Sequence, residues 1–163
     1  MTLPRTLSHD DIARRIPHQG AMCLLDAVTA WDDAQIQCLA SSHRDAANPL
    51  RAHGRLGAAC GVEYAAQAMA VHGALVGESM AGAVDNGAPR AGYLASIRSV
   101  TLHVDRLDTL DTPLLVSAER ITGDANTVLY SFSVTAGDTA LLSGRAVVVL
   151  DASALALPSG TPA

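Results

Sequence analysis

Apolar and polar residues alternate over several stretches in the second half of the chain, the pattern of half-buried β-strands. The clearest run is 127–136, where large apolar side chains at every second position alternate with smaller ones. Similar runs cover 92–104, 114–122 and 140–150, and turn-forming Gly-Asp and Asp-Thr pairs separate the runs. These four stretches predict an antiparallel sheet.

The first half of the chain predicts a short helix, a hairpin and one long helix. An N-capping serine followed by two acids predicts a helix over 9–15. Two strand-like runs within 22–41 meet at a pair of aspartates, which favours a hairpin. Residues 57–76 are small and apolar on nearly every face, which indicates a buried helix. The segment 42–55 shows no sustained period, so we expect an irregular loop.

This order of elements is typical of an α+β domain in which one antiparallel sheet curls around a central helix. A sheet of this size cannot wholly enclose the helix, so we expect a dimer with the two sheets edge to edge. The 163 residues suit a single domain, which we place at 1–150 and follow with a flexible tail over 151–163. The glycine-rich stretch 77–92 is expected to be a mobile connection.

Composition and charge exclude several functions. All 11 basic residues are arginine, so a P-loop lysine and a Schiff-base lysine are both absent. The net charge of −5 and the few aromatic residues leave no surface for nucleic acid. Three cysteines without C-x-x-C spacing indicate a reducing compartment. The chain shows neither a secretory start nor an uninterrupted apolar span, so we expect a cytoplasmic protein that does not cross a membrane.

The predicted long helix carries the first candidate chemistry. Glu63 and Gln67 are four residues apart, so they lie one above the other on the same helix face. A carboxyl group among small apolar residues ionises reluctantly, which suits a general acid. The alternative is that this face meets solvent or a subunit contact, because glutamate is rarely buried unless paired.

The remaining histidines offer weaker candidates. His72 is nine residues after Glu63 and therefore lies on the opposite helix face, where a core or helix-end histidine is expected. The possible metal ligands near the loop match no standard zinc spacing. These residues are His43, Asp45, His53 and Cys60. We therefore expect neither a metal site nor a cofactor.

Two motifs stand out, IPHQGAMCLLDAV over 16–28 and GVEYAAQ over 61–67. They resemble the opening motif and the central-helix motif of the FabZ-type 3-hydroxyacyl-(acyl carrier protein) dehydratases, and the later strands extend the likeness over about 10–150. The combination of I-P-H, N-P-L-R-x-x-G-R-L and G-x-E-Y-x-A-Q-A-x-A-x-H-G is most similar to a divergent branch. That branch is the ApeP-type dehydratase-like subunit of bacterial aryl polyene pathways, which pairs with a second hot-dog subunit.

This resemblance implies a hot-dog fold, dimeric assembly and the syn elimination of water from a 3-hydroxyacyl thioester on the phosphopantetheine of an acyl carrier protein. In that family a histidine takes the α-proton, an acid on the other subunit's helix protonates the leaving hydroxyl, and backbone N–H groups hold the thioester carbonyl. Glu63 inherits the role of the acid and Gln67 a supporting, substrate-binding role. The predicted helix N-terminus places the donors at Gly57 and Ala58.

The sequence departs from the family at the position of the catalytic base. The family's G-H-F-P-G turn is replaced by NPLRAHG, with an Asn-Pro pair where Gly-His is expected. His53, in the same loop, and His18, in the I-P-H motif, remain as candidate bases. Asn48 is a candidate substrate-binding residue. Arg44, Arg51 and Arg55 of the same loop are candidates as well, because guanidinium suits the carrier's phosphate or its acidic face. A solvated charged surface explains these arginines equally well.

Three functions therefore remain open. The first is a dehydratase with Glu63 as the acid and His53 or His18 as the base. The second is a non-catalytic subunit that pairs with a true dehydratase, because the family's histidine is missing. The third is a hot-dog thioesterase, on fold analogy alone. The sequence does not distinguish a homodimer from a heterodimer.

Overall fold

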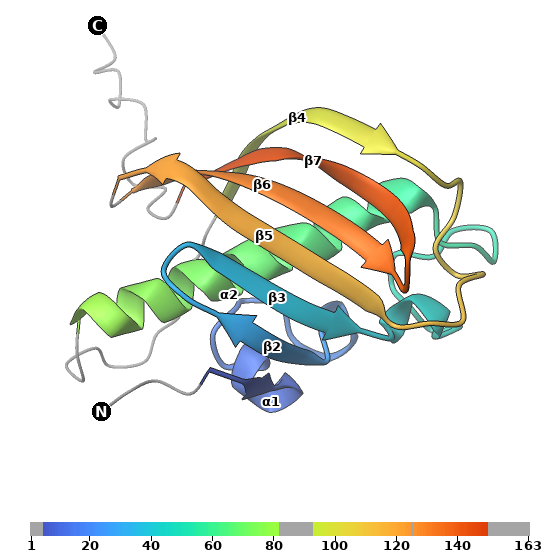
Figure 1. The fold of residues 1–163 in the computed structure, drawn as a ribbon. Helices are drawn as coiled ribbons and strands as arrows, with labels where there is room; N and C mark the ends of the chain where they lie inside the picture. Colours follow the sequence, from blue (N-terminus) through green and yellow to red (C-terminus); the bar gives the residue numbers. More distant parts are fainter. Residues whose placement is uncertain (1–4, 82–92, 125, 150–163) are drawn as a thin grey trace, which may run out of the picture.

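The computed structural model describes residues 5–81, 93–124 and 126–149. Most of the predicted connection 77–92 and the predicted tail 151–163 lie outside these residues. Within them, seven strands form one antiparallel sheet in the order β1-β2-β3-β5-β6-β7-β4. A single long helix, α2 (Gly61–Ala81), runs along one face of the sheet (Figure 1). The predicted α+β architecture, a sheet curled around one helix, is confirmed.

The chain begins with β1 (Leu7–Ser8) and α1 (His9–Ala13). Ser8 caps α1 as predicted, because its Oγ accepts the Asp11 N–H at 3.2 Å while the Asp11 carboxylate accepts the Ser8 N–H at 3.1 Å. The helix ends two residues earlier than predicted, where the chain tightens into a turn ahead of Pro17. Strand β1 was not predicted, because two residues are too few to show a period.

The predicted hairpin is formed by β2 (Ala27–Trp31) and β3 (Gln35–Ala40). The Asp32 carboxylate shapes its turn by accepting the N–H groups of Ala34 at 2.8 Å and Gln35 at 3.0 Å. The first strand starts later than predicted, because Gly20–Met22 form a 3₁₀ turn.

Helix α2 begins at Gly61 and not at residue 57, because a 3₁₀ turn over Ala58–Cys60 precedes it. Its buried side packs on β3, β5 and β6. Val62, Ala66 and Ala70, on its other side, remain partly exposed. The sheet therefore covers the helix from one side and leaves a strip of small side chains open.

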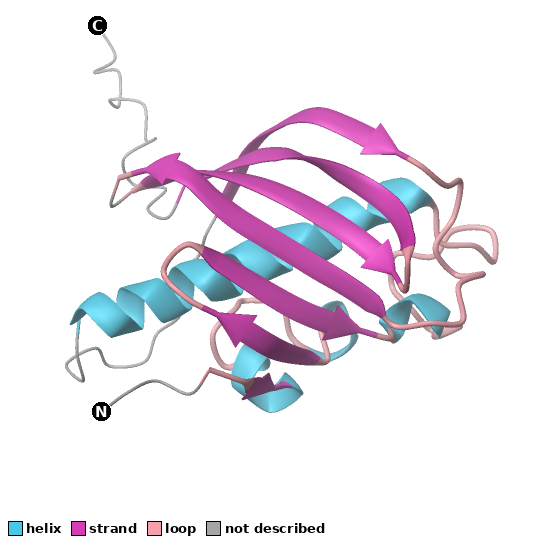
Figure 2. Ribbon diagram, in the orientation of Figure 1, coloured by secondary structure: helices cyan, strands magenta, loops and turns pink. Residues whose placement is uncertain are grey.

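Four strands complete the sheet where the alternating pattern predicted them (Figure 2). They are β4 (Tyr93–Leu102), β5 (Leu114–Gly123), β6 (Thr127–Ala136) and β7 (Thr139–Val149). Strand β4 pairs only with β7 and forms one edge of the sheet. Its large apolar side chains are 39–50% exposed. These side chains are Tyr93, Leu94, Ile97, Val100 and Leu102.

The three cysteines are free thiols. Cys38 lies in β3 with no exposed surface, and burial raises the pKa of its thiol to about 12. Cys23 is also buried, which raises its pKa, whereas Cys60 is partly exposed.

Among the described residues, no helix has the length and apolar character needed to cross a membrane.

Candidate active site

Glu63 lies in the first turn of α2, with one third of its side chain exposed. Its Oε1 is 3.1 Å from His18 Nε2 and accepts a hydrogen bond of 3.2 Å from Gln67 Nε2. The structure thus brings together His18 and Glu63, two predicted site residues that are 45 positions apart in the sequence. Gln67, the amide predicted to support the acid, contacts it as well. The apolar enclosure expected for the Glu63 carboxyl is only partly present, because part of this side chain is exposed.

Gln67 holds the segment that carries His18 against the helix. The residue has no exposed surface. Its Oε1 accepts the Leu24 N–H at 2.9 Å, and its Nε2 donates to the Met22 carbonyl at 2.8 Å as well as to Glu63. One buried amide therefore fixes both the N-terminal segment and the acid.

His18 is the histidine that meets the acid. Its side chain is 28% exposed, and its Nδ1 atom is buried without a hydrogen-bond partner in the described part of the chain. Because Nδ1 is buried, Nε2 is the ring nitrogen that can exchange a proton with Glu63 or with a substrate. The contact between Nε2 and Oε1 is short enough for a proton to pass directly between the two side chains.

His53 lies in a different environment. It occupies an exposed two-residue turn in which Ala52 and Arg55 exchange backbone hydrogen bonds of 3.0 and 3.1 Å. Both central residues have a positive φ, 54° for His53 and 73° for Gly54, as a type I′ turn requires. The structure shows no hydrogen bond from His53 to any described residue, so it does not bring this histidine to Glu63.

Asn48 is buried, and all its polar atoms bond within the protein. Its Nδ2 donates to the Ser42 carbonyl at 2.8 Å and to the Tyr64 hydroxyl at 3.1 Å, and its Oδ1 accepts the Leu50 N–H at 2.8 Å. The Tyr64 and Ser42 hydroxyls are 2.7 Å apart. Burial raises the pKa of Tyr64. This network, which the sequence did not suggest, fixes the loop to the helix position next to Glu63.

The loop arginines differ in how many hydrogen bonds their side chains already form within the protein. Arg51 donates to the carbonyls of Asp45 at 2.8 Å and His43 at 3.3 Å, and one of its amino groups lies 3.6 Å from the Asp108 carboxylate. The Arg55 side chain is exposed and bonds to no described residue, so its guanidinium is available to a ligand. The Arg106 guanidinium holds the pKa of Asp108 well below its usual range.

Gly57 is extended and pairs with Arg106 in an isolated bridge, and Ala58 is the first residue of the 3₁₀ turn that precedes the helix. The Ala58 N–H donates to the Asp105 carbonyl at 3.0 Å, and the Leu107 N–H donates to the Leu56 carbonyl at 2.8 Å. This bridge turns the Gly57 N–H away from the paired segment, where it has no described acceptor. Of the two predicted donors, only Gly57 remains free, and open space lies beside its Cα.

His72 is a core histidine on the far side of α2, as predicted. Its Nε2 donates to the Asp32 carbonyl at 2.8 Å, and its Nδ1 accepts from the Tyr130 hydroxyl at 2.7 Å. Burial lowers the pKa of His72. His43 is likewise buried and bonds through Nε2 to the Leu110 carbonyl at 3.0 Å. The described residues contain no cluster of three or more metal-ligating side chains.

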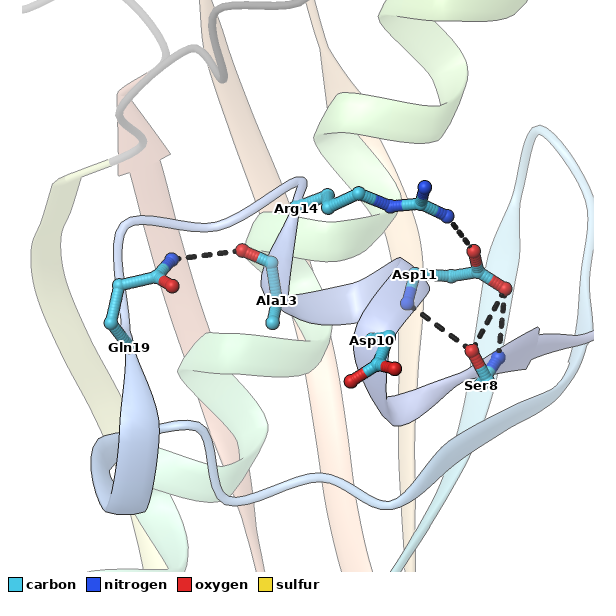
Figure 3. Close-up of a pocket in the computed structure, with 6 residues that line it drawn as sticks. All are labelled: Ser8, Asp10, Asp11, Ala13, Arg14 and Gln19. Carbon is cyan, nitrogen blue, oxygen red and sulfur yellow. Dashed lines mark hydrogen bonds and ion pairs between the residues drawn. The ribbon is translucent and has the colours of Figure 1, made fainter.

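An open hollow runs along α1 and does not include the Glu63 pair (Figure 3). It is lined by Ser8, Asp10, Asp11, Ala13, Arg14 and Gln19. Most of its polar groups already bond to one another, through the capping box, an ion pair between Arg14 and Asp11, and the 2.9 Å bond from Gln19 Nε2 to the Ala13 carbonyl. These internal bonds explain the hollow as the surface of a capped helix.

Comparison with solved structures places this fold among known hot-dog proteins. The dehydratase heterocomplex ApeI:P from Xenorhabdus doucetiae matches with a TM-score of 0.74 and 23% identity, over 89% of this chain and 91% of that chain. A thioesterase from Haemophilus influenzae matches with a TM-score of 0.59 and 12% identity, over 88% and 90% of the two chains. At these identities the structures establish the shared fold alone. No curated protein matches significantly.

The match to a family model is more specific than the match to the fold. The model of ApeP-like proteins, described as ApeP dehydratase, covers residues 10–156, and this range includes the histidine, acid and amide described above. The chain therefore belongs to the ApeP-like dehydratase family.

Proposed function

We propose that this chain is a catalytic dehydratase subunit that removes water from a 3-hydroxyacyl thioester carried by an acyl carrier protein. The contact between His18 and Glu63, held by the buried amide of Gln67, carries the proposal. A base and an acid are the two groups that β-elimination requires. The family supplies the class of reaction.

The proposed reaction needs an imidazole that can accept a proton and a carboxyl group that can donate one. His18 takes the proton from C2 of the acyl chain, the C2–C3 double bond forms, and the C3–O bond breaks as Glu63 protonates the departing hydroxyl. Water leaves, and the imidazolium then returns its proton to the carboxylate across the 3.1 Å contact. The Gly57 N–H is the donor we assign to the thioester carbonyl, where charge develops during proton removal.

We also propose a second hot-dog subunit as partner. The solved relative is a heterocomplex of two subunits, and β4 offers a free edge with five exposed apolar side chains. Such an edge is normally covered in proteins, because its unpaired backbone groups invite another strand. The carrier protein is the proposed source of substrate, with Arg55 as the available guanidinium for its phosphate.

The test is conversion of a 3-hydroxyacyl carrier protein, followed as the loss of one water by intact-protein mass spectrometry. Glu63→Gln and His18→Asn should each lower the rate by about 100-fold or more, since acid–base catalysis contributes roughly that much. His53→Asn is the matched variant, because it changes the same residue type in an exposed turn. Loss of activity in His53→Asn but not in His18→Asn would move the base to the loop.

A non-catalytic role is the second candidate, because Pro49 stands where the family's histidine is expected. The preceding Asn48 is fully used in structural hydrogen bonds. In that case water loss would require the partner subunit and would be unchanged by Glu63→Gln in this chain. Release of free thiol from the acyl carrier without water loss would instead identify a thioesterase.

A further inference from the structure

Two arginines lie side by side at the free edge of the sheet. Arg98 of β4 and Arg145 of β7 are directly opposed across the strand pair, and Arg145 is in turn opposed to Ser131 of β6. Directly opposed residues point to the same face, with Cα atoms about 4.5–5.5 Å apart. Ser131 lies between Tyr130 and Phe132, which are buried towards α2. Both arginines therefore project from the face opposite the helix.

Nothing in the described chain compensates these two charges. Both side chains are exposed, and neither forms a hydrogen bond or an ion pair with a described residue. Strands β4 and β7 contain no Asp or Glu. The acid in the same cross-sheet row, Glu119 of β5, lies beyond Ser131. By contrast, most of the other described arginines bond to a carbonyl or a carboxylate.

Pairing of β4 with a second copy of this chain would concentrate the same charge. If both helices lie on one side of a joined sheet, each outward residue must oppose another outward residue, because a slip of one position reverses the faces. In the two registers that bring the arginine rows nearest to each other, Arg98 would oppose Arg98 or Ser96 of the other copy. Either register brings four arginines together within neighbouring strands, and like charges directly opposed are destabilising.

We propose that the Arg98–Arg145 pair selects the subunit at the β4 edge: it disfavours a second copy of this chain and favours a different hot-dog chain with carboxylates on its matching edge strand. This inference rests on the β4 contact proposed above. Charge arrangements of this kind determine partner choice more than total affinity.

The test uses this chain and a charge-reversed copy that carries Arg98→Glu and Arg145→Glu, which provides an acidic edge of known structure. Both changed side chains are exposed, so folding should be unaffected. In sedimentation equilibrium, an equimolar mixture should form mixed dimers about tenfold more tightly than the wild-type chain self-associates. Added salt should weaken the mixed dimer and strengthen wild-type self-association. Arg55→Glu, a single arginine reversal away from β4, should form no preferred mixed dimer.

Ile97→Asp separates the failure of this inference from the failure of the proposed contact. Ile97 is 41% exposed on β4, and it is opposed to the buried Ala146. A charge there should abolish association if β4 is the contact. If Ile97→Asp abolishes association but the charge-reversed copy forms no preferred mixed dimer, the arginine selection alone is overturned. Association unaffected by any β4 substitution would overturn the contact and the selection together.

Discussion

Replacing Gln67 by leucine removes three hydrogen bonds while keeping a buried side chain of similar size. The change leaves the Leu24 N–H without its acceptor and the Met22 carbonyl without its donor. Leu24 is fully buried, whereas Met22 is partly exposed, so most of the cost comes from the first group. An unsatisfied buried group costs about 1–3 kcal/mol, and a smaller amount for the second gives a total of about 2–4 kcal/mol.

Urea denaturation measures this loss as a lower transition midpoint with an unchanged m-value. Gln37→Leu on the exposed face of β3 is the matched control, because the Gln37 side chain bonds to no described residue. Its free energy of unfolding should stay within about 0.5 kcal/mol of the wild type. A loss in Gln67→Leu no greater than that of the control would refute the claim that this amide fastens the N-terminal segment to α2. Dehydration should also slow, because Glu63 loses a hydrogen bond that orients it.

Three further predictions concern the core. Burial lowers the pKa of His72 from 6.5, so its stabilising contribution is complete above about pH 6.5 and is lost as the pH falls towards the lower folded value. Urea titrations at pH 7.5 and 5.5 should therefore show a larger loss for the wild type than for His72→Gln, and equal losses would contradict this account. Gly144→Ala should lower the free energy of unfolding by about 1–3 kcal/mol, because the added Cβ would lie 2.9 Å from Phe132 Cζ. A neutral result in thermal unfolding would mean that the ring moves aside freely. Tyr64→Phe should cost about 1–2 kcal/mol in chemical denaturation by removing a hydroxyl that Asn48 and a serine share, and an unchanged midpoint would show that the network adds no stability.

The sequence predicted the elements well wherever a period or a cap was present. The alternation in 127–136 and the capping serine at position 8 each produced the expected element. The start of α2 was placed too early, because residues 57–60 are as small and apolar as those of the helix. Their backbone is drawn into a bridge with residues 105–107, a tertiary contact that no local pattern records.

The arrangement of side chains around Glu63 could be predicted only in part, for a similar reason. The spacing of Glu63 and Gln67 follows from helix geometry and was visible in the sequence. The sequence left His18 and His53 open as the partner of Glu63, because no local pattern shows which histidine meets the acid. The folded chain brings His18 to the acid over 45 positions, by way of backbone hydrogen bonds to Gln67.

The buried thiol of β3 gives the protein an internal reporter of its own opening. With a pKa of about 12 and no exposed surface, Cys38 has almost no thiolate at neutral pH and no access to reagents while the sheet is closed. Alkylation of this residue therefore counts only molecules in which the β2–β3 region has separated from the helix. The partly exposed Cys60 labels directly and provides the internal reference for reagent activity. The ratio of the two labelling rates measures how often the fold opens under native conditions, without denaturant.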